Sequence, residues 1–200
     1  MLIAGAGGHA LEIFDVLLTL NYTVDEIFFY DDYSDTEELN KCEVIKNKQK
    51  LKDYFSLNED FCLGIGNPNL RNKMYSLMLD AGGKHIPIIS PLAFISNYAV
   101  NKGADIMPFS FVSSRSSLGL GTLINTRVNV HHEALIGEFN EISPSVNLLG
   151  QVKLGNFNTV GAGTTILPKI KMENNNIIGA GAVVTGDLNS GSKVKGIPAK

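Results

Sequence analysis

The second half of the chain carries an apolar residue at every sixth position. Neither the 3.6-residue period of an α-helix nor the two-residue period of a β-strand produces this spacing. A six-residue repeat is typical of a parallel β-helix, in which each hexapeptide supplies one short strand and one corner of a triangular coil. The fifteen positions are all apolar: Val100, Ile106, Val112, Leu118, Ile124, Val130, Ile136, Ile142, Leu148, Leu154, Val160, Ile166, Met172, Ile178 and Val184.

The repeat predicts both the core and the places left for chemistry. Each apolar residue is expected to point into the prism, because a coil can bury its core face only against neighbouring coils. The position four residues later is often small or able to stack, as in Asn140, Asn158 and Asn176. About five coils fit into residues 91–190, so functional residues are expected at outward or corner positions.

Residues 1–90 follow a different pattern, typical of an α/β domain. Leu11, Phe14 and Leu18 belong to one apolar helical face. Strands and helices alternate, which favours a parallel, Rossmann-like sheet covered by helices, about half the size of a full dinucleotide fold. Strands are expected at 1–4, 27–32, 60–67 and 85–90, with helices from residue 9 or 10 and over 68–82.

Composition excludes several classes of protein. The 200 residues carry a net charge of −3, so no basic field attracts nucleic acid or an anionic membrane. Two cysteines are too few for a disulfide framework or a cysteine-built zinc site. No apolar run approaches the length that spans a membrane, and the chain starts directly in a strand, so a cytoplasmic location is expected.

The opening residues, MLIAGAGGHA, read as a strand, a glycine turn and the start of a helix. Gly5, Gly7 and Ala10 match the dinucleotide fingerprint, and backbone N–H groups at a helix N-terminus suit any pyrophosphate. Asp31 and Asp32 end the second strand, where an acid hydrogen-bonds ribose in an NAD site. Half a Rossmann fold lacks a second lobe for nicotinamide, which favours another nucleotide over NAD.

A histidine pair marks one predicted corner, in the segment NVHHEALIGEF. His132 is the candidate general base, and the carboxylate of Glu133 is suited to orient it. The alternative is that these residues lie together on the surface by chance and have no catalytic role. A metal site is disfavoured, because only His131 and His132 lie in the prism and zinc needs further ligands. Since no nucleophile motif is present, direct transfer between two bound substrates is favoured over a covalent intermediate.

Taken together, these motifs resemble a known family. The segments GAGGHA, YDD and GIGN, the His-Glu corner and the closing GIPAK are similar to those of bacterial nucleotide-sugar acetyltransferases. That family includes N-acetyltransferases of UDP-4-amino-4,6-dideoxy sugars in bacillosamine synthesis, and sialic acid O-acetyltransferases. The resemblance implies an α/β Rossmann-like subdomain followed by a left-handed parallel β-helix. It also implies a homotrimer that binds acetyl-CoA between neighbouring subunits, without a metal.

The resemblance assigns roles to particular residues. It implies that His132 is the catalytic base and that Glu133 assists it. The implied nucleotide-sugar site contains Gly7, Gly8, His9, Asp31, Asp32, Gly66 and Asn67, and the implied cofactor contacts are Glu141, Gly150, Ala162 and Ala180. Many relatives have a second histidine where this chain has Glu141. An ionised glutamate cannot donate a hydrogen bond, so a backbone N–H near Gly150 is the expected oxyanion donor.

The expected function is therefore acetyl transfer from acetyl-CoA to the 4-amino group of a UDP- or dTDP-linked 4-amino-4,6-dideoxy sugar, for bacterial glycan synthesis. Acetylation of a sugar hydroxyl and a non-catalytic trimeric scaffold remain as alternatives. The expected domains are residues 1–90 for the nucleotide sugar, 91–190 for the β-helix and 191–200 for a C-terminal tail. Lys193, Lys195 and Lys200 in this tail are either CoA-phosphate contacts or a solvated basic end.

Overall fold

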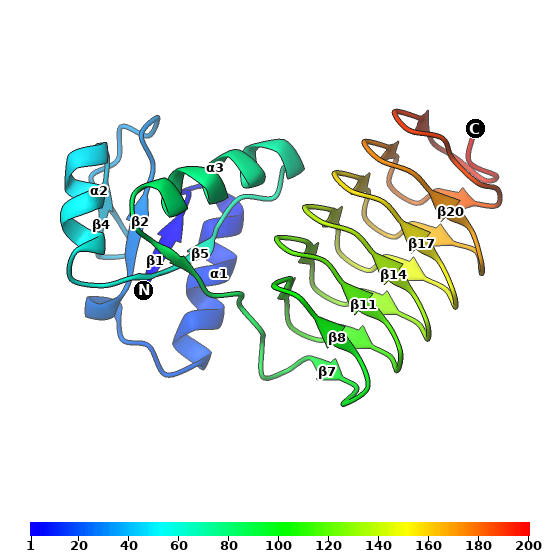
Figure 1. Cartoon of the computed structure of the whole chain (residues 1–200), viewed down its shortest axis with the longest axis horizontal. Helices are drawn as coiled ribbons and strands as arrows, with labels where there is room; N and C mark the ends of the chain where they lie inside the picture. Colours follow the sequence, from blue (N-terminus) through cyan, green and yellow to red (C-terminus); the bar gives the residue numbers. More distant parts are fainter. The chain divides into compact units, whose positions relative to one another are not determined.

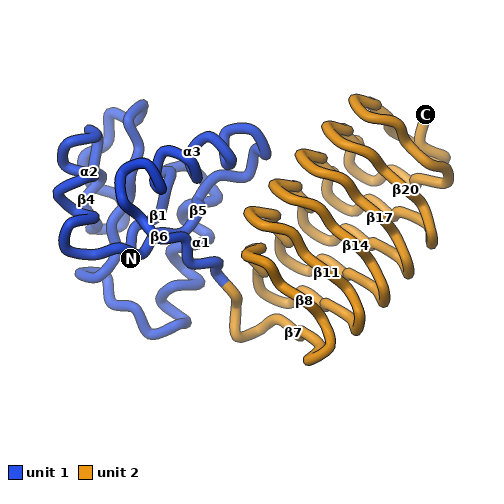
Figure 2. The backbone as a smooth tube through the Cα atoms, viewed as in Figure 1, with its two compact units in different colours: residues 1–88 blue, residues 89–200 orange.

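The structure is a computed structural model that describes all 200 residues (Figure 1). Two compact units, residues 1–88 and 89–200, follow one another along the chain (Figure 2). The first unit is an α/β domain and the second is a parallel β-helix, which confirms the predicted fold class.

The first unit contains a six-stranded sheet in the order β3-β4-β2-β1-β5-β6. All neighbouring strands are parallel except β3 and β4. The elements are β1 (Leu2–Ala4), α1 (Gly8–Thr19), a 3₁₀ turn (Val24–Glu26), β2 (Phe28–Tyr30), β3 (Glu38–Leu39), β4 (Cys42–Ile45), α2 (Lys48–Phe55), β5 (Asp60–Leu63), α3 (Pro68–Asp80) and β6 (Lys84–His85).

Successive side chains of a strand point to opposite faces of the sheet, so the core of this unit has two parts, one on each face. Leu2 and Ala4 of β1 pack in one cluster with residues of α2 and α3, such as Leu51 and Met78. On the other face, Phe14 of α1 stacks on Phe29 of β2, with ring centroids 6.1 Å apart. Asn67 caps α3 by accepting a hydrogen bond from the backbone N–H of Leu70.

Four elements of this unit differ from the sequence prediction. Helix α2 and strands β3 and β4 were not expected; only Leu51, Tyr54 and Phe55 are buried in the lysine-rich α2, so its helical pattern is faint. The prediction of a strand over 85–90 is wrong, because β6 covers only Lys84–His85. Pro87 has no N–H to continue a ladder. Ile89 already belongs to the second unit, within which it bridges to Ile106.

The second unit consists of two-residue strands in three parallel sheets. The first sheet contains β7 (Phe94–Ile95), β10 (Phe111–Val112), β13 (Asn129–Val130), β16 (Asn147–Leu148), β19 (Thr165–Ile166) and β22 (Val183–Val184). The second contains β8 (Val100–Asn101), β11 (Ser117–Leu118), β14 (Leu135–Ile136), β17 (Lys153–Leu154) and β20 (Lys171–Met172). The third contains β9 (Asp105–Ile106), β12 (Leu123–Ile124), β15 (Glu141–Ile142), β18 (Thr159–Val160), β21 (Ile177–Ile178) and β23 (Lys193–Val194).

The predicted inward residues are buried with one exception, Val100, which is 52% exposed. Leu118 pairs in register with Asn101, while Val100 pairs with Ser117. The first coil is therefore one residue shorter than the 18-residue coils that follow it, and Asn101 takes the inward register position. The Asn101 side chain closes this short corner by accepting hydrogen bonds from the N–H groups of Gly103, at 3.1 Å, and Ala104, at 2.8 Å.

Buried asparagines join three successive coils. Asn140, Asn158 and Asn176 occupy equivalent positions and are fully buried. The Asn140 side-chain oxygen accepts from both the backbone N–H and the side-chain amide of Asn158, each at 2.9 Å. The Asn158 side-chain oxygen in turn accepts from the N–H of Asn176 at 2.9 Å. This ladder satisfies backbone groups that the turns leave unpaired inside the prism.

We predict that Asn158→Ala destabilises the β-helix by about 1–3 kcal/mol, because it leaves the buried N–H of Asn176 without an acceptor. Thermal unfolding followed by circular dichroism measures the effect. Lys153→Ala, on an exposed position of β17, is the control and should leave the midpoint nearly unchanged. Equal midpoints for the two variants would contradict a structural role for the ladder.

Candidate active site

His132 and Glu133 form the turn between β13 and β14, at one corner of the β-helix. The same corner contains Arg115 one coil earlier and Gln151 one coil later. The N–H of Glu133 donates to the carbonyl of Ser114 at 3.1 Å, and the N–H of Gln151 donates to the carbonyl of His132 at 2.9 Å. Glu133 has a left-handed backbone, with φ of 60°. These hydrogen bonds hold successive corners in register. They thereby fix the backbone positions from which the side chains of His132 and Glu133 extend.

The carboxylate of Glu133 has three neighbours. Its Oε2 accepts a hydrogen bond from the Gln151 side-chain amide at 2.6 Å and lies 3.6 Å from Nδ1 of His132. Its Oε1 lies 3.5 Å from Nη1 of Arg115. The hydrogen bond that the carboxylate accepts from Gln151 is the largest cause of its lowered pKa, and His132 and Arg115, as further donors, lower the pKa of Glu133 as well. An ionised carboxylate therefore faces Nδ1, which leaves Nε2 as the basic nitrogen of a neutral His132.

Gly150 lies directly against the His132 ring. A Cβ at position 150 would lie 2.5 Å from Nε2 of His132. Gly150 is buried, and its N–H has no hydrogen-bond partner. The corner therefore places a basic nitrogen and a free backbone donor next to each other. This pairing can accept a proton from an attacking group and stabilise negative charge on a neighbouring oxygen.

The other predicted cofactor contacts lie elsewhere on the prism. Glu141 belongs to β15, in the third sheet, and Ala162 and Ala180 follow strands of that sheet at a different corner. One face of the prism separates that corner from His132, roughly 15–20 Å at ~3.3 Å per residue. A single chain therefore unites His132, Glu133 and Gly150, but not Glu141, Ala162 or Ala180.

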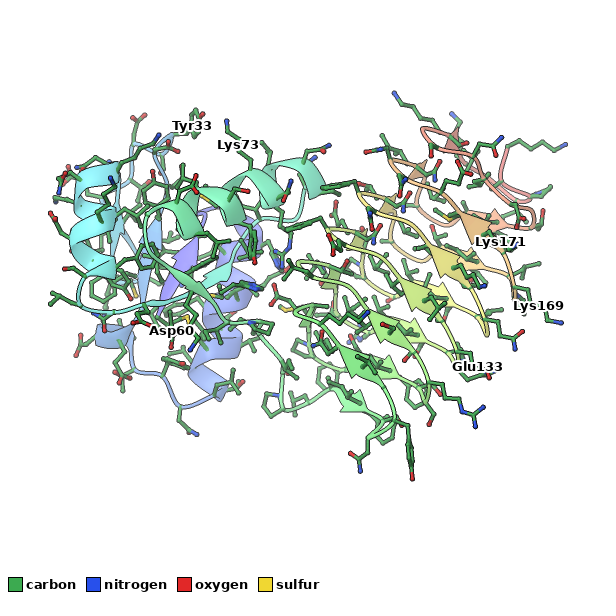
Figure 3. All side chains as sticks on the ribbon, in the orientation of Figure 1. Tyr33, Asp60, Lys73, Glu133, Lys169 and Lys171 are labelled. Carbon is green, nitrogen blue, oxygen red and sulfur yellow. The ribbon has the colours of Figure 1, made fainter.

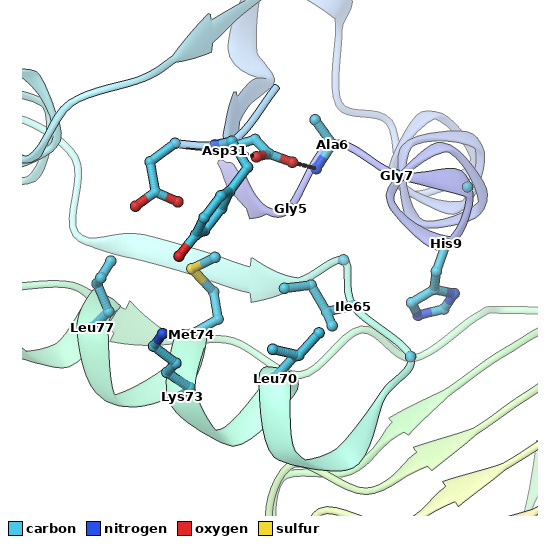
Figure 4. A pocket seen from close by; sticks show the side chains of 15 residues that line it. Gly5, Ala6, Gly7, His9, Asp31, Ile65, Leu70, Lys73, Met74 and Leu77 are labelled. Atoms are coloured by element: carbon cyan, nitrogen blue, oxygen red, sulfur yellow. Dashed lines mark hydrogen bonds between the residues drawn. The ribbon is translucent and has the colours of Figure 1, made fainter. Parts of the chain in front are cut away.

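The first unit contains a cavity of about 580 Å³ (Figure 4). Its lining includes most of the residues predicted to hold a nucleotide sugar: Gly7, Gly8, His9, Asp31, Asp32 and Gly66. Asn67 is absent from the lining, since its side chain caps α3. The helix N-terminus at Gly8 opens onto the cavity, where its free N–H groups favour an anion.

The two acids at the end of β2 have different partners. Asp31 accepts hydrogen bonds from the N–H groups of Ala6, at 3.2 Å, and of Tyr33 and Ser34, at 2.9 and 3.0 Å. It thereby ties the glycine turn to the loop after β2. Asp32 makes no such bond and is exposed, so its carboxylate can accept from a ligand. On the other side, His9 hydrogen-bonds Glu12 at 2.9 Å, which lowers the pKa of Glu12.

The cavity also contains residues that sequence reasoning missed. Leu70, Lys73, Met74 and Leu77 line it from α3, and Tyr33 lines it from the loop after β2 (Figure 4). The four residues of α3 are spaced three, four and seven residues apart from Leu70, so they lie on one face of the predicted helix. This spacing was the signal in the sequence that could have identified them. Lys73 is the only Lys or Arg among the lining residues, and its ammonium forms no ion pair. Figure 3 labels Tyr33 and Lys73 at this edge of the first unit.

Comparisons with known proteins agree with this geometry. Residues 1–78 match the family model of the PglD N-terminal domain. The acetyltransferase domain of PglB from Neisseria gonorrhoeae FA1090 is 29% identical, with a TM-score of 0.90 over 100% of this chain and 97% of that chain. The same domain has been solved in complex with acetyl coenzyme A. The chain is an acetyltransferase with a PglD-type N-terminal domain and a left-handed β-helix.

Two further structures extend the match. A mutant of perosamine N-acetyltransferase from Caulobacter crescentus, in complex with CoA and GDP-perosamine, is 26% identical to this acetyltransferase. Its TM-score is 0.93, over 100% of this chain and 94% of that chain. WeeI from Acinetobacter baumannii AYE, at 22% identity, has the same fold, with a TM-score of 0.80 over 100% of this chain and 97% of that chain. None of the helices in the acetyltransferase is long and apolar enough to cross a bilayer.

We predict that Gly150→Ala lowers kcat for acetyl transfer at least tenfold, because the new methyl displaces the imidazole of His132. Steady-state kinetics by thiol release measures the loss. Gly186→Ala is the matched control: a Cβ there meets nothing within 4 Å, and neither glycine has a positive φ. Wild-type kcat in Gly150→Ala would show that the packing of His132 on Gly150 is irrelevant to catalysis.

Proposed function

We propose that the protein transfers acetyl from acetyl-CoA to the 4-amino group of a UDP- or dTDP-linked 4-amino-4,6-dideoxy sugar. The observation that carries this proposal is the placement of Nε2 of His132 beside the unpaired N–H of Gly150. The 26% identical relative from Caulobacter crescentus, crystallised with CoA and GDP-perosamine, supports a nucleotide-linked amino sugar as the class of acceptor. The reaction would serve bacterial glycan synthesis in the cytoplasm.

The proposed mechanism is direct transfer. The neutral amine attacks the thioester carbonyl, and Nε2 of His132 takes the amine proton as the new C–N bond forms. The carboxylate of Glu133 stabilises the imidazolium through Nδ1. The N–H of Gly150 donates to the oxyanion, which then collapses with loss of the CoA thiolate. The thiolate finally takes the proton from His132, which restores the base.

The cavity of the first unit has the groups that a nucleoside diphosphate requires. The N-terminus of α1 offers N–H groups to the pyrophosphate, and Asp32 is free to accept from ribose hydroxyls. Apolar residues of α3, among them Met74 and Leu77, form a wall for a base. Without Lys73 the cavity would present two carboxylates to a dianionic ligand, so we assign its unpaired ammonium to charge compensation.

A homotrimer with shared active sites is part of the proposal. Glu141, Ala162 and Ala180 lie away from His132 in one chain, so a second copy is needed to bring both sets to one acetyl-CoA. The outer face of the first β-helix sheet supports this association because its strand residues carry no charge: Phe94, Phe111, Asn129, Asn147, Thr165 and Val183. An uncharged face of this kind suits burial against another subunit.

The test incubates the protein and acetyl-CoA with UDP-, dTDP- and GDP-linked 4-amino-4,6-dideoxy sugars and follows thiol release. Turnover with a UDP or dTDP sugar is the expected result. Turnover only with the GDP sugar would overturn the nucleotide assignment. No turnover, with acetyl-CoA still bound, would favour a hydroxyl acceptor such as sialic acid. No binding of acetyl-CoA would leave a non-catalytic scaffold.

We predict that His132→Ala lowers kcat/KM by about 10²–10⁴-fold, the usual contribution of a general base. Activity of the wild type should fall at low pH, because both His132 and the amine must be unprotonated. His131→Ala is the matched control, since that ring lies near Phe111, at a centroid distance of 6.3 Å, on the adjoining face. Retention of wild-type kcat/KM in His132→Ala would exclude His132 as the base.

A further inference from the structure

One corner of the β-helix carries a column of polar side chains with identical backbone geometry. Arg115, Glu133, Gln151 and Lys169 follow one another at intervals of 18 residues. All four have a left-handed backbone, with φ of 60°, 60°, 63° and 66°. Their side chains therefore leave the prism in the same direction, one coil or about 4.8 Å apart. Figure 3 labels Glu133 and Lys169 along this edge.

Within this column, Gln151 makes the shortest contact to the carboxylate beside the base. Its Nε2 donates to Oε2 of Glu133 at 2.6 Å, and the same oxygen lies 3.6 Å from Nδ1 of His132. The opposing partner, Arg115, is 79% exposed and 3.5 Å from Oε1. An exposed ion pair of this kind holds a side chain weakly. Gln151 is thus the contact that selects the orientation of the Glu133 carboxylate.

We propose that Gln151 is a positioning residue, whose amide holds Oε2 of Glu133 against Nδ1 of His132. This inference rests on the proposed role of His132 as the base. A neutral amide is the suitable chemistry for the task, because it orients the carboxylate without cancelling its charge. The full charge of Glu133 then stabilises the imidazolium, and Nδ1–H is kept directed at Oε2 while Nε2 receives the proton.

The electrostatics of the corner support this role. The hydrogen bond from Gln151 is the largest cause of the lowered pKa of Glu133. The other charged groups in the column are Arg115 and Lys169, and His131 lies on the adjoining face. The carboxylate within ion-pair distance of His132 is that of Glu133, with Oε2 at 3.6 Å from Nδ1. The Glu133 carboxylate is therefore the charged group that faces the His132 ring in the wild type.

Loss of the amide changes the pH profile in a defined direction. In Gln151→Ala, Glu133 is free to turn toward Arg115, so the imidazolium loses stabilisation. With the imidazolium less stabilised, the acid limb of kcat/KM moves to lower pH while the plateau value of kcat decreases. We expect kcat to fall about tenfold, with KM for both substrates unchanged, because only the charge developing in the transition state is affected.

The decisive experiment is a double-mutant cycle of Gln151→Ala and Glu133→Gln, with full pH profiles for each enzyme. If Gln151 acts through Glu133, then Gln151→Ala lowers kcat in the wild type but has no further effect in Glu133→Gln. Equal losses in both backgrounds would overturn the proposal. An unshifted acid limb in Gln151→Ala would overturn it as well.

Lys169→Ala is the matched control, since it also places alanine on a left-handed corner of the same column. It should reproduce any loss of stability in Gln151→Ala without the shift in the pH profile. An equal shift in Lys169→Ala would overturn the proposal, because the effect would then follow from corner strain. Failure of the proposed function gives a different result: His132→Ala retains activity, whatever the outcome of the cycle.

Discussion

The burial of one apolar side chain per hexapeptide is the interaction on which the second unit depends. Residues such as Val130 and Leu148 are buried because they stack in register across successive coils. No coil can bury this face alone, so each is held by its neighbours. The register repeats every 18 residues, and this repeat brings equivalent corner positions one above another. The chemistry of the corner follows from the packing of the core.

The candidate active-site corner illustrates this dependence. His132 reaches over Gly150, and Gln151 reaches Glu133, because the backbones of these coils are hydrogen-bonded in register. Glycine at position 150 leaves both the space for the imidazole and an unpaired N–H beside it. The hydrogen-bonded stack of coils thus fixes the positions of these groups, and such preorganisation is the condition for electrostatic stabilisation of a transition state.

The first unit uses a different physical device. Its parallel strands end at one edge of the sheet, where the glycine turn after β1 and the acids after β2 line a cavity. The Asp31 carboxylate accepts hydrogen bonds from both loops and joins them, whereas the charged groups of Asp32 and Lys73 form no ion pair within the protein. The first unit thus offers a candidate nucleotide cavity and the second a candidate catalytic corner, because each fold leaves different polar groups unpaired.

Much of this architecture could be predicted from sequence periodicity. The six-residue repeat identified the β-helix and its buried residues, and the glycine turn and the His-Glu corner indicated the two candidate sites. The errors have physical causes. Val100 faces outward because the first coil is one residue shorter, and the side chain of Asn101 stabilises that short turn. Helix α2 was missed because its lysines obscure the three residues that it buries.

The sequence by itself determined the class of fold, the core positions and the residue types available for chemistry, because these depend on periodicity and composition. Only the tertiary structure decided which side chains meet. Tyr33 and Lys73 lie far apart in the sequence yet line one cavity, and Gln151 reaches Glu133 across 18 residues. Contacts of this kind depend on strand register and corner conformation, which the pattern of apolar and polar residues does not encode locally.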